Sequence, residues 1–296
     1  MTKKRAFAFI FLLIFVGTIL VGCARTKEPA GENGATGEGV EETDNANETA
    51  VSGTETTEGK AETSEEENPY EKEEEPSAEP QTNRAFYVRS KTDGLNVRAG
   101  AGTNYRSLGT LDKGDMVAYI GECDGWYETK FVGVTAYVSA SAKYTEKVAM
   151  EKGAEKAERV IEEGFGLLGT KYVYGAVRLH DGSGRLNAGF DITAFDCSSF
   201  MQYVFYYGAD EILQVNTRTQ VYQGESVEKA AIERGDLLFF TNASRYYNSG
   251  VERIGHVALY LGDGYILHTA SDHAVAEKIS EKRQSYFICA RRIITD

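Results

Sequence analysis

One cysteine in the C-terminal half stands where nucleophilic chemistry is possible. Cys197 follows Asp196 and precedes two serines in the stretch FDITAFDCSSFMQYVF, residues 190–205. Asp196 suits the N-cap position of a helix. We therefore expect Cys197 in a first helical turn, where free backbone N–H groups and the helix dipole lower the pKa of a thiol. The apolar residues that follow share one helical face with Cys197: Phe200, Met201, Val204 and Phe205.

A cysteine on the apolar face of a helix is more often a packing residue. Whether Cys197 is a nucleophile therefore depends on the residues that could act with it. A thiol nucleophile needs a base, and the base needs an orienting group. Of the four histidines, His256 and His268 stand in the strand-like segments IGHVALYLG and YILHTA, which Gly262-Asp263-Gly264 joins. His180 lies in a glycine-rich stretch and His273 among polar residues.

The register of this hairpin decides whether the two histidines can act together. With a three-residue turn, Leu261 pairs with Tyr265. His256 and His268 then project from the same face as diagonal neighbours, about 7–8 Å apart at Cα. With a two-residue turn they face opposite sides. Gly264 favours the longer turn, because such loops place a left-handed residue at that end.

The motifs and their order resemble those of the NlpC-type cell-wall peptidases, a papain-like family of cysteine endopeptidases. That family carries a Tyr-x-aromatic-Gly-Gly segment, Asp-Cys-Ser-Gly, a Gly-Asp-Leu strand, an Ile-Gly-His-Val strand and a second histidine. The matching stretches here are YVYGA (172–176), DCSS (196–199), GDLLFF (235–240), IGHV (254–257) and ILH (266–268). The resemblance implies an α+β, papain-like catalytic domain over residues 150–296.

The resemblance also implies a catalytic triad and a reaction. Cys197 is the nucleophile, His256 is the general base that later protonates the leaving amine, and His268 orients His256. The reaction is hydrolysis of peptidoglycan stem peptides at the γ-D-glutamyl-diamino acid bond through an acyl-enzyme. No metal or other cofactor is implied.

Three further residues match substrate-binding positions of the family. Tyr172 matches a tyrosine near the nucleophile. Asp196 and Ser198 match positions that in related enzymes receive the free N-terminal amine of a stem peptide. Helix capping alone also explains Asp196.

The chain departs from the family pattern around the nucleophile. Ser199 replaces a glycine and adds a side chain that we expect close to the cleft, and Ala176 replaces the second glycine of the tyrosine segment. Between residues 176 and 195 the chain carries an insertion of about a dozen residues relative to the family. We expect this insertion near the active site, with His180, Asp181 and Arg185.

Residues 84–145 have the pattern of a small all-β domain, because Gly-rich turns separate short Val- and Tyr-rich runs. They resemble a bacterial SH3-like domain through LNVR (95–98), LGTL (108–111), GWY (125–127) and GVTAYV (133–138). Such domains bind cell-wall peptides or pack on a catalytic partner. Between the two domains, helical spacing of apolar residues predicts a helix from Ala154 to Leu168, with Gly169 as its cap.

The N-terminus has the pattern of an export signal, in which Lys3, Lys4 and Arg5 precede an apolar run. The run ends in LVGC, residues 20–23, which resembles the bacterial lipoprotein box and implies acylation of Cys23 after removal of residues 1–22. A cleaved secretory signal or an uncleaved anchor is the alternative. The lipid on Cys23 would anchor the protein to the outer side of the cytoplasmic membrane.

Residues 24–83 contain 18 acidic and 4 basic side chains, whereas the whole chain carries a net charge of −13. This composition predicts a disordered tether that spans about 40–45 Å. Residues 84–296 are nearly neutral, which gives no indication of nucleic-acid binding. The sequence leaves the oligomeric state open.

Three other functions remain to be weighed. A catalytically silent wall-binding or regulatory lipoprotein could retain the triad residues for structural reasons. A zinc hydrolase would use Cys197, His256 and His268 as ligands, but the chain has no His-Glu-x-x-His segment to supply a base. A solute-binding lipoprotein is disfavoured, because residues 84–296 are too few for two large α/β lobes.

Overall fold

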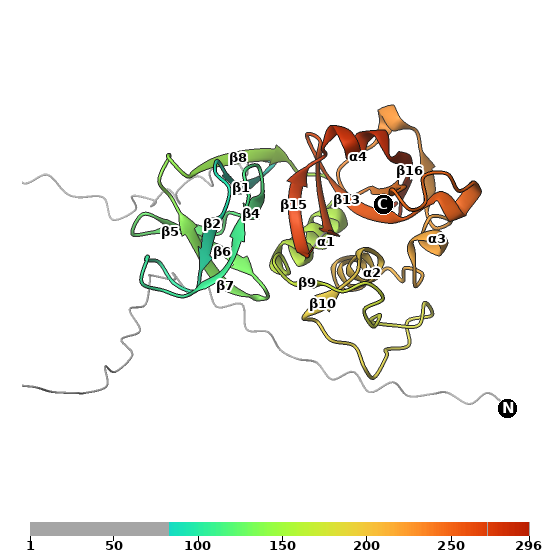
Figure 1. The fold of residues 1–296 in the computed structure, drawn as a ribbon, viewed down its shortest axis with the longest axis horizontal. Coiled ribbons are helices and arrows are strands. Elements are labelled where there is room, and N and C mark those ends of the chain that lie inside the picture. The colour runs from blue at the N-terminus through green and yellow to red at the C-terminus, as the bar shows by residue number, and fades with distance from the viewer. Residues whose placement is uncertain (1–82, 271, 296) are drawn as a thin grey trace, which may run out of the picture. The chain divides into compact units, whose positions relative to one another are not determined.

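The computed structural model describes residues 83–270 and 272–295 (Figure 1). The expected signal peptide, the lipidation site Cys23 and nearly all of the expected tether lie outside these residues. Within the described part of the chain, no helix is long and apolar enough to cross a membrane.

The N-terminal eight strands form two antiparallel sheets, one with the order β4-β1-β8 and one with the order β3-β2-β7-β6-β5. Alternation along the strands buries small and branched side chains between the sheets, among them Val88, Val97 and Val138. The small all-β domain expected from the turn pattern is confirmed. Its strands are β1 (Arg84–Ser90), β2 (Leu95–Arg98), β3 (Ser107–Leu111), β4 (Met116–Ala118), β5 (Gly121–Cys123), β6 (Trp126–Phe131), β7 (Val134–Ser139) and β8 (Thr145–Glu151).

The C-terminal part is an eight-stranded sheet with helices, in the order β10-β9-β15-β14-β13-β12-β16-β11. Its strands are β9 (Lys171–Tyr172), β10 (Ala194–Phe195), β11 (Glu225–Val227), β12 (Leu237–Phe240), β13 (His256–Gly262), β14 (Tyr265–Ala270), β15 (His273–Lys278) and β16 (Phe287–Arg292). Its helices are α1 (Glu155–Gly166), α2 (Cys197–Ala209), α3 (Thr217–Gln220) and α4 (Glu281–Ser285), with 3₁₀ turns η1 (Lys229–Ala231) and η2 (Gly250–Arg253).

Helices α1 and α2 pack against each other, and both contact β14, while α2 also contacts β13. The two helices cross closely because Gly208 lets the backbones approach: a Cβ there would lie 2.5 Å from Cα of Val160. The helix expected over 154–168 is present, but it ends at Gly166 with Leu167 as its C-cap. Gly169 has a positive φ of 81° beyond the helix and is not the cap residue that the sequence predicts.

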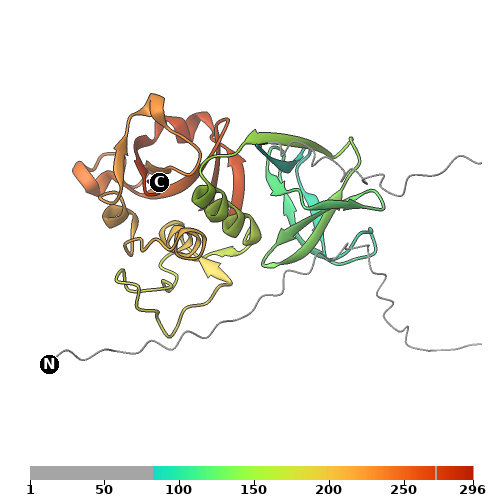
Figure 2. The same cartoon turned by 180° about the vertical axis from the view of Figure 1, so that it is seen from behind.

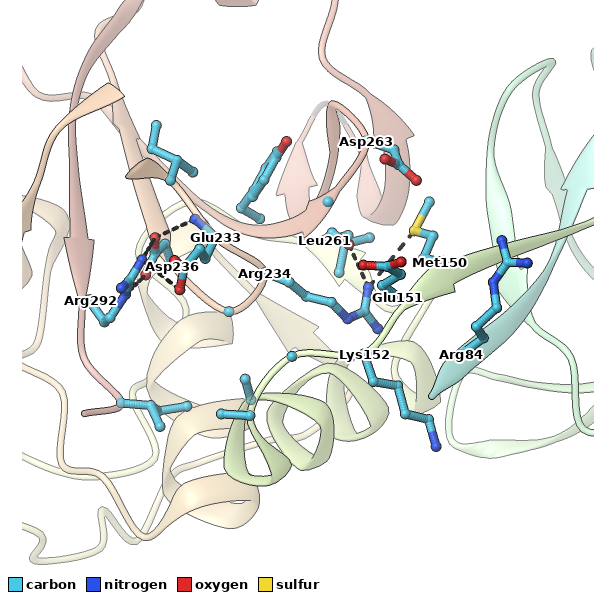
Figure 3. A pocket seen from close by; sticks show the side chains of 18 of the residues that line it. Arg84, Met150, Glu151, Lys152, Glu233, Arg234, Asp236, Leu261, Asp263 and Arg292 are labelled. Atoms are coloured by element: carbon cyan, nitrogen blue, oxygen red, sulfur yellow. Dashed lines mark hydrogen bonds and ion pairs between the residues drawn. The ribbon is translucent and has the colours of Figure 1, made fainter. Parts of the chain in front are cut away.

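The small all-β domain, called the barrel below, is joined to the C-terminal part by specific contacts. Figure 2 shows α1 between the two, and α1 contacts β4 and β6 as well as α2. Arg234 lies at this junction, where its Nε donates to Glu158 at 2.6 Å and its Nη1 to the Leu261 carbonyl at 2.5 Å. Its Nη2 also donates to the hydroxyl of Tyr87 in β1. Figure 3 shows this guanidinium beside Leu261 and Met150, at the edge of a cavity of about 990 Å³.

Candidate active site

Cys197 is the first residue of α2, as the sequence predicts. The side chains on its helical face, Phe200, Met201, Val204 and Phe205, are fully buried against the sheet. Cys197 itself is 8% exposed and lines a pocket. The packing of the helix therefore holds the thiol at the boundary between the core and the pocket.

The start of α2 is a capping box. Asp196 accepts a hydrogen bond from the Ser199 N–H at 2.9 Å, and the Asp196 N–H donates to the Ser199 hydroxyl at 2.8 Å. Ser199 is therefore buried within the helix start and does not line the pocket, contrary to the expectation that it would lie close to the cleft. The serine that departs from the family pattern stabilises the position of Cys197.

The expectation of a lowered thiol pKa is wrong. Burial, together with the negative charge of Asp196, raises the pKa of Cys197 to about 12. Hydrogen bonds from the backbone N–H groups of Val257 and Ser198 lower this pKa, but they do not offset the desolvation. In the free protein the thiol is neutral.

The hairpin that carries His256 and His268 has the expected register, but its turn is shorter than expected. Gly262 pairs with Tyr265 across a two-residue turn, in which Asp263 and Gly264 both have positive φ. The register shifts at Leu261, so the strands continue as a three-residue turn would have placed them. The expected pairing of Leu261 with Tyr265 is wrong, since one bulged residue compensates for the shorter turn.

The two histidines are therefore brought together. Nε2 of His256 and Nδ1 of His268 lie 2.9 Å apart, within hydrogen-bond distance. His256 begins β13 between Gly255, which lines the same pocket as Cys197, and Val257, whose N–H is bonded to the thiol. The candidate base therefore lies next in sequence to a backbone group that binds the candidate nucleophile, at the start of β13.

Glu277 on β15 completes this series of hydrogen bonds and determines its proton positions. Its Oε1 lies 2.9 Å from Nε2 of His268. Hydrogen bonding to His268 and the charge of Arg283 lower the pKa of Glu277 although burial opposes them, so the group is a carboxylate that only accepts. His268 must then carry its proton on Nε2, and its Nδ1 accepts from His256. This leaves Nδ1 of His256 unprotonated and available as a base.

Both histidines are neutral in this environment. Burial, followed by the electrostatic effects of His268 and Arg283, lowers the pKa of His256 well below its ordinary value of 6.5. Burial also lowers the pKa of His268, although Glu277 opposes that effect. The site therefore holds a neutral thiol and a neutral imidazole.

The pocket beside Cys197 has a volume of about 330 Å³. The expected substrate-binding residues Tyr172, Asp196 and Ser198 all line it. Burial, with the nearby Cys197 and Asp196, raises the pKa of Tyr172, so its hydroxyl is a proton donor. A second pocket of about 550 Å³ shares Tyr172 and is lined on its other side by barrel residues, among them Leu108 and Phe131.

The insertion contributes a residue that the sequence did not single out. Arg178 reaches Asp196 at 2.7 Å and Ser198 at 3.2 Å, and it lines the pocket. Asp181 and Arg185, which the sequence did single out, pair with each other at 3.0 Å on the surface. His180 is buried against Tyr206 and Gln202.

Glu277 was missed as well. The strand-like segment after His268 could have indicated it in the sequence. If that segment pairs with the strand of His268, as β15 does with β14, Glu277 lies opposite Ile266, two residues from His268. As for metals, the described residues contain no group of three His, Cys, Asp or Glu side chains arranged to hold an ion.

A cysteine at the start of a helix, packed on a mainly antiparallel sheet that carries a histidine, is the papain-like arrangement. Residues 169–292 match the NlpC/P60 family, and residues 93–145 match the bacterial SH3 domain. The chain thus contains an NlpC/P60 domain preceded by a bacterial SH3 domain.

Relatives of known name share this region. The chain is 34% identical over 122 residues to the gamma-D-glutamyl-L-lysine dipeptidyl-peptidase of Bacillus subtilis, covering 41% of this chain and 34% of that protein. It is 30% identical over 138 residues to the peptidoglycan DL-endopeptidase CwlO of Bacillus licheniformis, covering 46% and 27%. A solved NLP/P60-family structure from Staphylococcus aureus, described as similar to lipoprotein, is 28% identical with a TM-score of 0.39, covering 50% and 44%. The chain matches only about a third or less of the length of these two curated relatives.

Proposed function

We propose that this protein is a cysteine endopeptidase that hydrolyses peptidoglycan stem peptides at the γ-D-glutamyl-diamino acid bond. The observation that carries the proposal is the hydrogen-bonded series from Glu277 through His268 to His256, which ends at the start of β13, where the next backbone N–H, that of Val257, is bonded to the Cys197 thiol. The names of the two curated relatives support the substrate class.

In the first step of the proposed reaction, the thiol of Cys197 gives its proton to Nδ1 of His256 as the bound substrate is attacked. The sulfur attacks the amide carbonyl carbon, and the backbone N–H of Ser198 at the helix start donates to the developing oxyanion. The imidazolium then gives its proton to the leaving amine, and the C–N bond breaks. Water, deprotonated by His256, attacks the thioester, and the proton returns to the sulfur as the acid product leaves.

The neutral resting pair fits general-base catalysis. Because the pKa of Cys197 is raised and that of His256 is lowered, a preformed thiolate–imidazolium pair is disfavoured in the empty pocket. Proton transfer then accompanies attack on bound substrate. His268 and Glu277 offset the cost of the imidazolium, since Nδ1 of His268 already accepts from His256 and the negative charge of Glu277 lies behind it.

The other parts of the chain suit a peptidase that works outside the cytoplasmic membrane. The proposed domains are a lipoprotein signal over residues 1–23, a tether over 24–83, an SH3-like domain over 84–145 and the peptidase over 150–296. The lipid on Cys23 would hold the protein at the membrane, and the barrel would bind wall peptide or border the cleft near Tyr172.

A second candidate is a wall-binding protein without turnover. It is favoured by one observation, the neutral and nearly buried thiol of Cys197. Such a protein would bind stem peptides and leave them intact.

The test is digestion of purified peptidoglycan by the full-length protein in detergent, with fragments identified by mass spectrometry. Products that end in D-glutamate on one side and begin with the diamino acid on the other support the proposal. Binding of the polymer with no new fragments supports the second candidate, and cleavage at another bond refutes the assigned specificity.

A further inference from the structure

Arg178 is held rigidly beside the nucleophile. Its Nε donates to the Val215 carbonyl at 2.8 Å, and its Nη1 donates to the carbonyl of Ala176. Its Nη2 reaches both Asp196 and Ser198. The side chain is only 21% exposed, so its position is determined by the fold.

Arg178 forms an ion pair with the Asp196 carboxylate, the group that would otherwise bind a substrate ammonium. One oxygen of Asp196 accepts from the Ser199 N–H and the Ser198 hydroxyl, both at 2.9 Å. The other oxygen accepts from the Gly175 N–H at 3.2 Å and from Arg178 at 2.7 Å. A carboxylate offers about four acceptor positions. Asp196 therefore has no acceptor position left for an incoming amine.

The positive charge of the pocket also disfavours binding of a substrate ammonium. Its lining includes Arg178, Arg218 and Arg245, against one carboxylate from Asp196. Glu252, which pairs with Arg218 and Arg245 at 3.4 and 3.1 Å, does not line the pocket. A cation placed here meets like charges in a partly desolvated space, which is unfavourable, whereas carboxylates of a stem peptide are attracted.

We infer that Arg178 is a specificity-determining residue that removes the need for a free N-terminal amine. The cleft then takes stem peptides whose N-terminus is blocked as an amide, as it is where the peptide is still attached to the glycan strand. The inference rests on the proposed function, because it names the form of the substrate that the same site accepts.

The test compares L-Ala-γ-D-Glu-diaminopimelate with its N-acetyl form, using the full-length protein. We expect kcat/KM for the blocked peptide to be higher than that for the free peptide, or lower by no more than about threefold. A preference for the free amine of about 30-fold or more would overturn the inference. If neither peptide is cleaved, the proposed function fails, and calorimetric binding of both to the Cys197→Ala variant still tests the inference by the same ratio.

Two variants isolate the role of the arginine. Arg178→Met frees one oxygen of Asp196, so the preference should shift toward the free amine by about tenfold or more. Arg185→Met, in the same loop but 84% exposed, is the matched control and should leave the ratio unchanged. An unchanged ratio in folded Arg178→Met contradicts the inference.

A further substitution covers the case in which Arg178→Met does not fold. Asp196→Asn should alter the cleavage of both peptides to the same degree, because the carboxylate is not the amine receptor. A selective loss of the free-amine peptide would show that Asp196 does bind the amine, and would overturn the inference.

Discussion

Replacement of Glu277 by glutamine tests the proton relay at the residue farthest from the chemistry. In the proposed reaction His256 becomes positively charged, and the carboxylate stabilises that charge through His268 at 2.9 Å. A hydrogen bond to a charged group contributes about 1.5–3 kcal/mol. At about 1.4 kcal/mol for each factor of ten, kcat should fall by roughly 10- to 150-fold.

The substitution should act on kcat and not on KM, because Glu277 does not line the pocket beside Cys197. It should also shift the acid limb of the pH profile. Arg283, 3.5 Å from Glu277, already lowers the pKa of His256 and His268, and loss of the carboxylate leaves that effect unopposed. The acid limb of kcat should therefore move to lower pH.

The assay is steady-state hydrolysis of a stem peptide over a range of pH, with thermal unfolding of each variant as a check on folding. Glu281→Gln is the matched control, since Glu281 is exposed in the first turn of α4 and should leave kcat unchanged. If Glu277→Gln retains kcat within about twofold, or raises KM alone, the relay reasoning is refuted.

Three further predictions concern pH and packing. The lowered pKa of His256 and the pKa of about 12 for Cys197 predict a kcat/KM that is flat between pH 6.5 and 9; a steep rise across this range would contradict the neutral pair. Gly208→Ala places a Cβ 2.5 Å from the α1 backbone and should destabilise the fold by about 1–3 kcal/mol in urea unfolding, whereas Gly166→Ala, with open space around it, should not. Arg234→Met leaves its carboxylate partner Glu158 partly buried, with only the Gly153 N–H as a donor, and should cost up to about 3–5 kcal/mol by the same measurement; a loss below about 1 kcal/mol would mean that the pair is solvated.

Local rules were sufficient for the elements that hold the site. The spacing of apolar residues after Cys197 and the capping preference of Asp196 predicted α2 from its first residue, because both signals lie within a few positions. The hairpin shows where such rules run out. Its register was right, but the turn was two residues long with a bulge at Leu261, a detail that depends on backbone conformation at the turn.

The parts that sequence patterns did not reveal depend on contacts between distant segments. Glu277 reaches His268 only because β15 folds back on β14. The position of the Arg283 charge beside Glu277 depends on the same packing. Arg178 belongs to a loop without regular structure, whose path no periodicity determines. The pKa of Cys197 was misjudged for a related reason: the helix start was visible in the sequence, whereas the depth of burial was not.

The most direct test of the central claim is hydrolysis of N-acetyl-L-Ala-γ-D-Glu-diaminopimelate by the full-length protein and by its Cys197→Ala variant, followed by mass spectrometry. The account predicts cleavage after D-glutamate by the parent protein, and no cleavage by a variant that unfolds at nearly the same temperature. Cleavage at a comparable rate by folded Cys197→Ala would contradict the assignment of Cys197 as the nucleophile.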